Sequence, residues 1–258
     1  MSLGRAEERG SLSSSRSVSE MRRYLLADDN RALADNLAEI LRDDGAEVAI
    51  ANDGADALRL LSSTTFDALI TDMRMPVLSG AGLIKALRGV DPGLPVMVMT
   101  AYAGESDLED ALHSGVLAVL PKPVPIAHLL SLVQGARRNG LVAIVEDDVS
   151  LCNNLAEALR DRGFTAVAAS SALQAERLAD VRPFVAVVDL KLPGTRPGAL
   201  LEYLAGHFPL QPLLVMSGYP DLAPGVAGIT VREHFTKPFS TEVLLATIER
   251  IHASLSTR

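Results

Sequence analysis

The sequence contains the same pattern twice, and this duplication restricts the fold more than any other feature. The segment at residues 36–43, NLAEILRD, reappears at residues 154–161 as NLAEALRD, 118 positions later. Asp72 maps onto Asp189 at an offset of 117, so the two copies stay in step with only small deletions. An internal repeat of this length predicts two domains that share one fold.

The repeat and the composition divide the chain into three segments. Residues 1–20 are rich in Ser, Arg and Glu and lack the apolar core of a secretory signal, so we expect a disordered tail or linker there. Residues 21–138 form the first predicted domain, and residues 139–258 form the second. Of the 258 residues, 48% are hydrophobic and 22% are charged, a balance that lets each domain bury its own core.

Charge, hydropathy and cysteine content narrow the class of protein. The formal net charge of −8 and the pI near 5.2 argue against a protein that mainly binds nucleic-acid phosphates. The most membrane-like segment, residues 116–133, contains Lys122 and three prolines that break a spanning helix. The single cysteine, Cys152, has no internal disulfide partner and is expected to fill a small space in the core. We therefore expect a soluble, cytoplasmic protein that binds neither nucleic acid nor membrane.

Hydrophobic patterning predicts alternating strands and helices in each copy. In the first copy, the expected strands are at residues 24–27, 47–51, 68–72, 95–100 and 118–120. Apolar residues at helical spacing lie between them, as in residues 33–41, and further helices are expected at residues 55–61, 82–87, 106–113 and 126–134. Strands that are apolar on both faces, each followed by a helix, indicate an α/β fold with a parallel sheet covered on both sides.

The strand at residues 68–72 poses a question, because its apolar run ends in a lone carboxylate. Asp72 ends this run in LITDMRMP, and Asp189 ends the corresponding run in VAVVDLKLP. An unpaired buried carboxylate is costly, but the carboxyl ends of parallel strands share one edge, where ligand sites lie. The other polar residues expected at these edges are Asp28, Asp29, Thr100 and Lys122 in the first copy, and Glu146, Asp147, Ser217 and Lys237 in the second.

This set of side chains predicts a site for magnesium and phosphate. Three carboxylates at one edge repel one another unless a cation joins them, and all-oxygen ligands suit Mg²⁺. A magnesium site of this kind usually takes a phosphate as well, whose oxygens Thr100 and Lys122 would bind. One carboxylate would act as the nucleophile and form an aspartyl phosphate.

Each of these residues also has a simpler interpretation when it is taken alone. The pair Asp28-Asp29 fits a helix N-cap, Asp72 fits a turn residue before Pro76, and Lys122 fits a solvated surface lysine. The ordered set occurs twice at corresponding strand ends, and this recurrence favours a functional site over the purely structural interpretation.

Both copies resemble the receiver domains of two-component response regulators, from Met21 to about His252. The motifs that carry the resemblance are the acidic pair, the strand-end Asp followed by Pro four residues later, the Thr or Ser, and the Lys-Pro pair. The resemblance implies two flavodoxin-like (CheY-like), doubly wound, five-stranded parallel sheets in tandem. It also implies cis peptide bonds at Lys122-Pro123 and Lys237-Pro238.

The resemblance further implies roles for individual residues. The phosphoacceptors would be Asp72 and Asp189. The other ligands of Mg²⁺ would be Asp29 and Asp147 directly, Asp28 and Glu146 through water, and Arg74 and Lys191 through their backbone carbonyls. The residues that bind phosphate and take part in switching would be Thr100, Lys122, Ser217 and Lys237.

The two copies depart from the family pattern in different places. After Ser217, two prolines and several glycines predict a shortened fourth helix in the second copy, so the surface read by a partner should differ between copies. Three residues before the lysine, receivers usually carry a Tyr or Phe that turns inward on activation, whereas these copies carry Val119 and His234. We interpret His234 as a surface residue rather than as a pH-sensitive switch.

Four side chains are expected to set the lifetime of the phosphoryl group. Arg74 and Lys191 lie two residues after the acceptors, and Tyr102 and Tyr219 lie two residues after the hydroxyl residues. By the resemblance, these side chains flank the path of the attacking water. A bulky phenol beside a long cation, with no carboxylate or amide to orient the water, predicts slow self-dephosphorylation in both domains.

The resemblance implies a phosphoacceptor in a histidine-to-aspartate relay rather than a metabolic enzyme. The expected partners are a sensor histidine kinase or histidine phosphotransfer protein and a downstream protein target, with a homodimer as a further expectation. No DNA-binding or enzymatic output domain is expected. The alternatives are receivers that serve as docking modules or phosphate sinks, and a fragment of a larger kinase or regulator.

A third alternative is a hydrolase similar to the haloacid dehalogenases. Such enzymes carry a second Asp two residues after the nucleophile, but Arg74 and Lys191 occupy those positions here.

The sequence also limits how far the two domains can separate. Only residues 135–140 connect them, a length that spans roughly 20 Å when extended.

Overall fold

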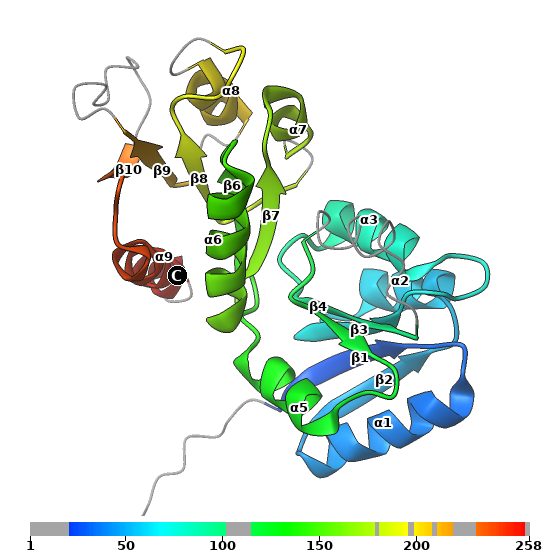
Figure 1. Cartoon of the computed structure of the whole chain (residues 1–258). Coiled ribbons are helices and arrows are strands. Elements are labelled where there is room, and N and C mark those ends of the chain that lie inside the picture. Colours follow the sequence, from blue (N-terminus) through cyan, green and yellow to red (C-terminus); the bar gives the residue numbers. More distant parts are fainter. Residues whose placement is uncertain are drawn as a thin grey trace, which may run out of the picture.

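The computed structural model of the chain describes residues 21–101, 115–178, 181–195, 199–207, 211–218 and 231–255. Within these ranges, each half of the chain forms a five-stranded sheet flanked by helices (Figure 1). All the strand pairs in the two sheets are parallel. The predicted α/β fold, with two flavodoxin-like (CheY-like) sheets in tandem, is confirmed.

The first sheet has the strand order β2-β1-β3-β4-β5. Its strands are β1 (Arg23–Ala27), β2 (Glu47–Ala51), β3 (Ala68–Asp72), β4 (Val96–Thr100) and β5 (Ala118–Pro121). Every residue of the central strands β3 and β4 is buried. Both faces of these strands are therefore covered, which explains why apolar residues occupy successive positions rather than every second one. The expected strand limits differ from the observed ones by at most one residue.

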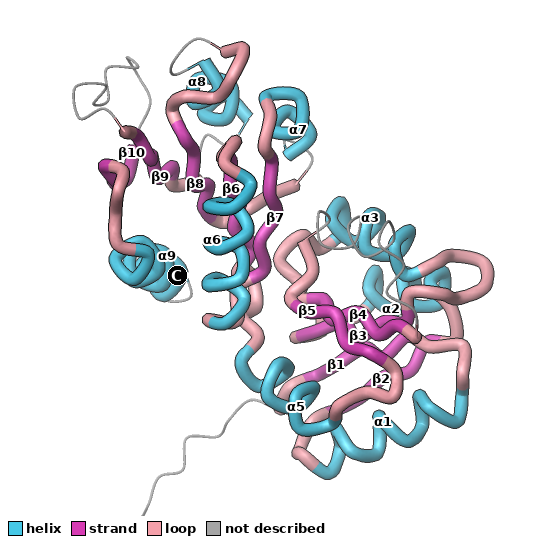
Figure 2. Tube along the Cα trace, viewed as in Figure 1, coloured by secondary structure: helices cyan, strands magenta, loops and turns pink. Residues whose placement is uncertain are grey.

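Four described helices cover the two faces of this sheet. They are α1 (Arg31–Asp43), α2 (Gly54–Ser63), α3 (Gly80–Val90) and α5 (Ile126–Gly135). Leu41 of α1 and Leu129 of α5 belong to one core cluster, whereas Leu61 of α2 and Leu83 of α3 belong to the other. Helices α1 and α5 therefore cover one face and α2 and α3 cover the opposite face (Figure 2).

The second sheet repeats this arrangement. Its strands are β6 (Leu141–Val145), β7 (Thr165–Ala169), β8 (Val185–Asp189), β9 (Leu213–Ser217) and β10 (Val231–Thr236), in the order β10-β9-β8-β6-β7. Its described helices are α6 (Val149–Asp161), α7 (Ala172–Arg177), α8 (Ala199–His207) and α9 (Thr241–Leu255). Helices α6 and α9 share one core cluster and α7 and α8 share the other, so the layers match those of the first domain.

The structure tests several of the remaining expectations. Both predicted cis peptide bonds, at Lys122-Pro123 and Lys237-Pro238, are present. Cys152 is buried in the core of the second domain, as expected. The tail at residues 1–20, the helix at residues 106–113 and the shortened fourth helix of the second copy lie outside the described residues. Among the helices that the structure describes, none combines the length and the apolarity needed to cross a lipid bilayer.

Candidate functional site

The predicted polar residues of the first copy gather at the carboxyl edge of the first sheet. Asp28 and Asp29 follow β1, Asp72 ends β3 and Thr100 ends β4. Lys122 follows β5 directly, and its backbone amide donates to the carbonyl oxygen of Thr100 at 2.8 Å. This hydrogen bond fixes the turn after β5 to the end of β4, so the lysine side chain starts beside the acidic residues.

The three carboxylates of this edge form one compact cluster with Lys122. Ligand oxygens of Asp28, Asp29 and Asp72 all lie within 4.8 Å of one another. The Lys122 Nζ lies 2.7 Å from Asp28 Oδ2 and 3.2 Å from Asp72 Oδ2, so a single ammonium joins two of the three carboxylates. Asp29 is exposed and completes the cluster on its solvent side.

Burial and charge act in opposite directions on Asp72. Burial raises the pKa of its carboxyl group, and the hydrogen bond and positive charge of Lys122 offset part of this rise. Asp28 is 0% exposed, and its second oxygen accepts a hydrogen bond from the amide of Asn30 at 2.9 Å. The cluster therefore holds more carboxylates than one lysine can neutralise, which favours the binding of a further cation.

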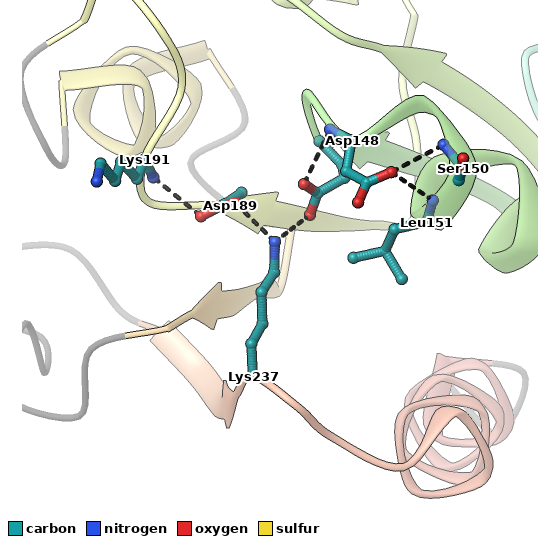
Figure 3. Close-up of polar contacts among 7 residues, drawn as sticks. Asp148, Ser150, Leu151, Asp189, Lys191 and Lys237 are labelled. Atoms are coloured by element: carbon teal, nitrogen blue, oxygen red, sulfur yellow. Dashed lines mark hydrogen bonds and ion pairs between the residues drawn. The ribbon is translucent and has the colours of Figure 1, made fainter.

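The second domain builds the same arrangement from a slightly different set. Ligand oxygens of Glu146, Asp147 and Asp189 lie within 4.8 Å of one another. Lys237 Nζ lies 2.6 Å from Glu146 Oε2 and 2.7 Å from Asp189 Oδ2. Figure 3 shows the side chain of Lys237 extending toward Asp189. The lysine bridge between two carboxylates is thus common to both domains.

The electrostatics of the second cluster follow the same rules. Burial raises the pKa of the Glu146 carboxyl group, and the hydrogen bond from Lys237 opposes this effect. Burial by itself lowers the pKa of Lys237, but its hydrogen bonds to Asp189 and Glu146, together with their charges, raise it overall. The amide of Lys191 donates to Asp189 Oδ1 at 2.9 Å and orients the carboxylate (Figure 3). Ser217 is buried at the end of β9, and its carbonyl oxygen accepts from the Lys237 amide at 2.8 Å.

The structure rejects the interpretation of the acidic pairs as helix N-caps. The cap of α1 is Asn30, whose side chain accepts from the amide of Leu33. The cap of α6 is Asp148, whose carboxylate accepts from the amides of Ser150 and Leu151 (Figure 3). Sequence reasoning missed both cap residues, although an Asn or Asp just before a helical pattern is a known signal. Because Asn30 and Asp148 cap these helices, the carboxylates of the acidic pairs before them take part in the two clusters instead.

Sequence reasoning also missed Gly80, the first residue of α3. A Cβ atom at this position would overlap the carbonyl oxygen of Asp72, so only glycine lets α3 begin this close to the end of β3. No signal in the sequence separates this glycine from those of ordinary turns.

The residues expected to modulate rate or switching are only partly described. Arg74 and Lys191 are exposed beside the acceptor positions, whereas Tyr102 and Tyr219 lie outside the described residues. Val119 packs against the core cluster that α2 and α3 cover. His234 is half-buried rather than fully on the surface, and its Nε2 atom is buried with no hydrogen-bond partner within the described part of the chain.

The donor set of each cluster fits a hard divalent cation. Three carboxylates within 4.8 Å, on an edge that stays open at Asp29 and at Asp147, match the all-oxygen, partly hydrated coordination of Mg²⁺. A carboxylate at the same edge can act as a nucleophile toward phosphorus, and the nearby ammonium and hydroxyl groups can bind phosphoryl oxygens.

Comparisons with known proteins agree with this geometry. A family model described as response regulator receiver domain matches residues 24–134 and again residues 142–249. A response regulator receiver protein of Anaeromyxobacter sp. (strain Fw109-5) is 52% identical over 232 residues, which cover 90% of this chain and 96% of that protein.

Two further relatives match about half of the chain. The transcriptional regulatory protein PrrA of Mycobacterium leprae (strain TN) is 38% identical over 122 residues, which are 47% of this chain and 52% of that protein. Among solved structures, the receiver domain of a sensor histidine kinase from Pseudomonas aeruginosa PAO1, with a magnesium ion in its active-site cleft, is 30% identical. That match covers 44% of this chain and 95% of the solved chain, with a TM-score of 0.42.

Proposed function

Because the chain belongs to the response regulator receiver family, we propose that it accepts phosphoryl groups at Asp72 and Asp189 in a histidine-to-aspartate relay. The observation that carries this proposal is the double occurrence of one cluster. In each domain, three carboxylates lie within 4.8 Å of one another, and one lysine bridges the buried acidic residue and the strand-end Asp.

In the proposed reaction, an oxygen of the Asp72 carboxylate attacks the phosphorus atom of the donor. A P–O bond to Asp72 forms while the bond between phosphorus and the donor's leaving atom breaks, and the leaving atom departs in line. Mg²⁺, when bound by the acidic cluster, supplies charge that offsets the phosphoryl oxygens.

Lys122 and Thr100 have positions suited to hold the transferred group. Lys122 Nζ is 3.2 Å from Asp72 Oδ2, so it reaches a phosphoryl oxygen on Asp72 by exchanging this ion pair for a new one. Thr100 ends the neighbouring strand β4, and its hydroxyl is proposed to bind another phosphoryl oxygen. Ser217 and Lys237 have the corresponding places in the second domain.

The remaining ligands of Mg²⁺ are part of the same proposal. Asp29 and Asp147 would bind the ion directly because they are the exposed members of their clusters. Asp28 and Glu146 would act mainly through water, because each already pairs with a lysine. The backbone carbonyls of Arg74 and Lys191 would complete the protein ligands.

A phosphorylation assay with a small phosphodonor and Mg²⁺ tests the assignment. We expect Asp72→Asn and Asp189→Asn each to remove one of two labelled sites, and the double variant to remove all labelling. Chelation of Mg²⁺ should have the same effect as the double variant. Asp148→Asn is a matched control, because Asp148 adjoins the second cluster but caps α6, and this variant should label normally. Full labelling of the double variant would refute the assignment, and no labelling of the wild type would favour a docking module instead.

The proposed partners follow from this chemistry. A sensor histidine kinase or a histidine phosphotransfer protein would supply the phosphoryl group, and a downstream protein would read the phosphorylated state by direct contact. Phosphorylation would act by shifting the equilibrium between two conformations of each receiver.

The lifetime of the phosphoryl group is a further part of the proposal. The exposed side chains of Arg74 and Lys191 flank the acceptors, and Tyr102 and Tyr219 are proposed to shield the phosphorus from water. Slow self-dephosphorylation would suit a lasting signal or a relay. We expect Tyr102→Ala and Tyr219→Ala to shorten the lifetime of the acyl phosphate in their own domain. An unchanged or longer lifetime would contradict the shielding.

A further inference from the structure

The segment that connects the two receivers is bonded firmly to the first domain. The linker, residues 136–140, follows α5 and leads into β6. The guanidinium of Arg138 forms a bidentate ion pair with Asp91, at 2.8 and 2.6 Å. The amide of Asn139 donates to the carbonyl oxygen of Gly93 at 2.8 Å. Asn139 has a positive φ of 58°, a conformation that Asn tolerates better than most residues and that these contacts hold in place.

The same linker is bonded equally firmly to the second domain. Arg137 donates its amide to the Gly163 carbonyl oxygen at 2.9 Å and its Nε to the Arg162 carbonyl oxygen at 2.7 Å. Its guanidinium lies 4.8 Å from the centre of the Phe164 ring. His252 of α9 donates from Nε2 to the carbonyl oxygen of Arg138 at 2.9 Å, so α9 also contacts the linker.

The linker is supported from the first domain by a buried arginine. Arg88 of α3 is 5% exposed and donates to the carbonyl oxygens of Pro92 and Leu94 at 2.8 and 3.1 Å, and also to that of Gly115. The first two carbonyl groups flank Gly93, to which the linker binds. Arg88 therefore fixes the loop that receives Asn139.

The two domains also touch without the linker. Arg160 of α6 donates from Nε to the carbonyl oxygen of Val116, at 3.3 Å. A Cβ atom on Gly115 would lie 2.5 Å from Val167 Cγ1 of β7, so this glycine packs directly on the second sheet. Contacts therefore join the domains at several points that are separated in sequence.

Most of these contacts lie at the amino edges of the two sheets, and the contact of Gly115 with Val167 reaches the middle of β7. Gly93 precedes β4, Gly115 precedes β5, and Phe164 precedes β7, whereas Asp72 and Asp189 end their strands. A five-residue strand spans about 15 Å, so each acceptor lies at the edge of its sheet that is far from these contacts. In Figure 1 the linker runs from α5 to β6, away from the ends of β3 and β8.

We propose that this joint, formed by residues 136–140 and the residues that they contact, holds the two receivers as one rigid body and leaves both acceptor edges outside the contact between domains. A partner that binds one receiver then meets the other at a fixed orientation. The proposal depends on the joint and not on phosphorylation, so it can fail while the proposed function stands.

Distance measurements between two spin labels test the rigidity of the two-domain chain of 258 residues. Lys85→Cys in α3 and Glu157→Cys in α6 place one label on an exposed position of each domain. The buried Cys152 should remain unlabelled. Pulsed electron paramagnetic resonance should give one narrow distance distribution. A distribution as broad as that of two freely tumbling domains would overturn the proposal.

A single methyl group provides a sharper test. In Gly93→Ala, the new Cβ atom would lie 2.8 Å from Asn139 Cα and 2.5 Å from Asn139 Oδ1, so the joint must open and the distribution should broaden. Gly89→Ala is the matched control, because nothing lies within 4 Å of the corresponding Cβ atom and the distribution should stay narrow.

A second variant keeps the test valid if Gly93→Ala fails to fold, which circular dichroism would reveal. Arg138→Ala removes the partly buried ion pair with Asp91 and should broaden the distribution to a smaller extent. If the folded variants both stay as narrow as the Gly89→Ala control, the joint does not fix the domains and the proposal is wrong.

Discussion

Replacement of Lys122 by methionine should destabilise the first domain and make its stability depend strongly on Mg²⁺. Lys122 Nζ lies 2.7 Å from Asp28, which is 0% exposed. Removal of one member of a buried ion pair costs about 3–5 kcal/mol, because the other charge stays buried without a partner. The Lys122 side chain is itself 17% exposed, so we expect the lower end of this range, about 3 kcal/mol. In a domain of this size, that loss lowers Tm by about 10 °C.

Mg²⁺ should reverse most of this loss, since it supplies the positive charge that the lysine provided. Calorimetry in the presence of a chelator and at saturating Mg²⁺ measures both effects, and Lys237→Met identifies the corresponding transition of the second domain. Lys85→Met, at an exposed position of α3, is the matched control and should shift neither transition. The reasoning would be refuted if Lys122→Met left Tm unchanged in chelator, or if Mg²⁺ stabilised this variant less than the wild type.

Three further predictions test other parts of the structure. Gly80→Ala should displace the end of β3, destabilise the first domain by about 1–3 kcal/mol and weaken its phosphorylation, whereas Gly89→Ala should do neither. Arg88→Met should cost about 3 kcal/mol in urea unfolding, because three carbonyl groups lose a charged donor, and an unchanged midpoint would contradict this account. Burial raises the pKa of Cys152 to about 11, so little thiolate exists at pH 8. Ellman's reagent should therefore react slowly with Cys152 in the native protein and rapidly after unfolding. A rapid reaction of the native protein would argue against the buried position of Cys152.

Much of the fold could be predicted because its signals are local. The apolar runs that became β3 and β8 are short and bounded by turn residues, so their limits followed from the sequence alone. The repeat then showed which residues correspond between the copies. Because the carboxyl ends of parallel strands meet at one edge, the sequence also indicated which polar side chains would gather there.

The pairings within the site could not be predicted, because they join residues far apart in the chain. Lys122 bonds to Asp28 across 94 positions, and Lys237 bonds to Glu146 across 91. The sequence placed these residues at the same edge, but only the packed strands decide which carboxylate becomes buried and therefore which one needs the lysine most. The rise in the pKa of Asp72 has the same origin, since burial is a property of the folded domain.

The sequence by itself therefore determined the parallel fold of both copies, the strand limits of the first sheet and the residues that line the carboxyl edges. Only the tertiary structure decided how the two domains meet. A linker of a few residues sets an upper limit on separation, but it does not show that Arg138 reaches Asp91 or that Arg88 supports the receiving loop. Such contacts depend on the shapes of two surfaces that form only after each domain has packed its own core. The hydrophobic periodicity of the sequence therefore does not predict them.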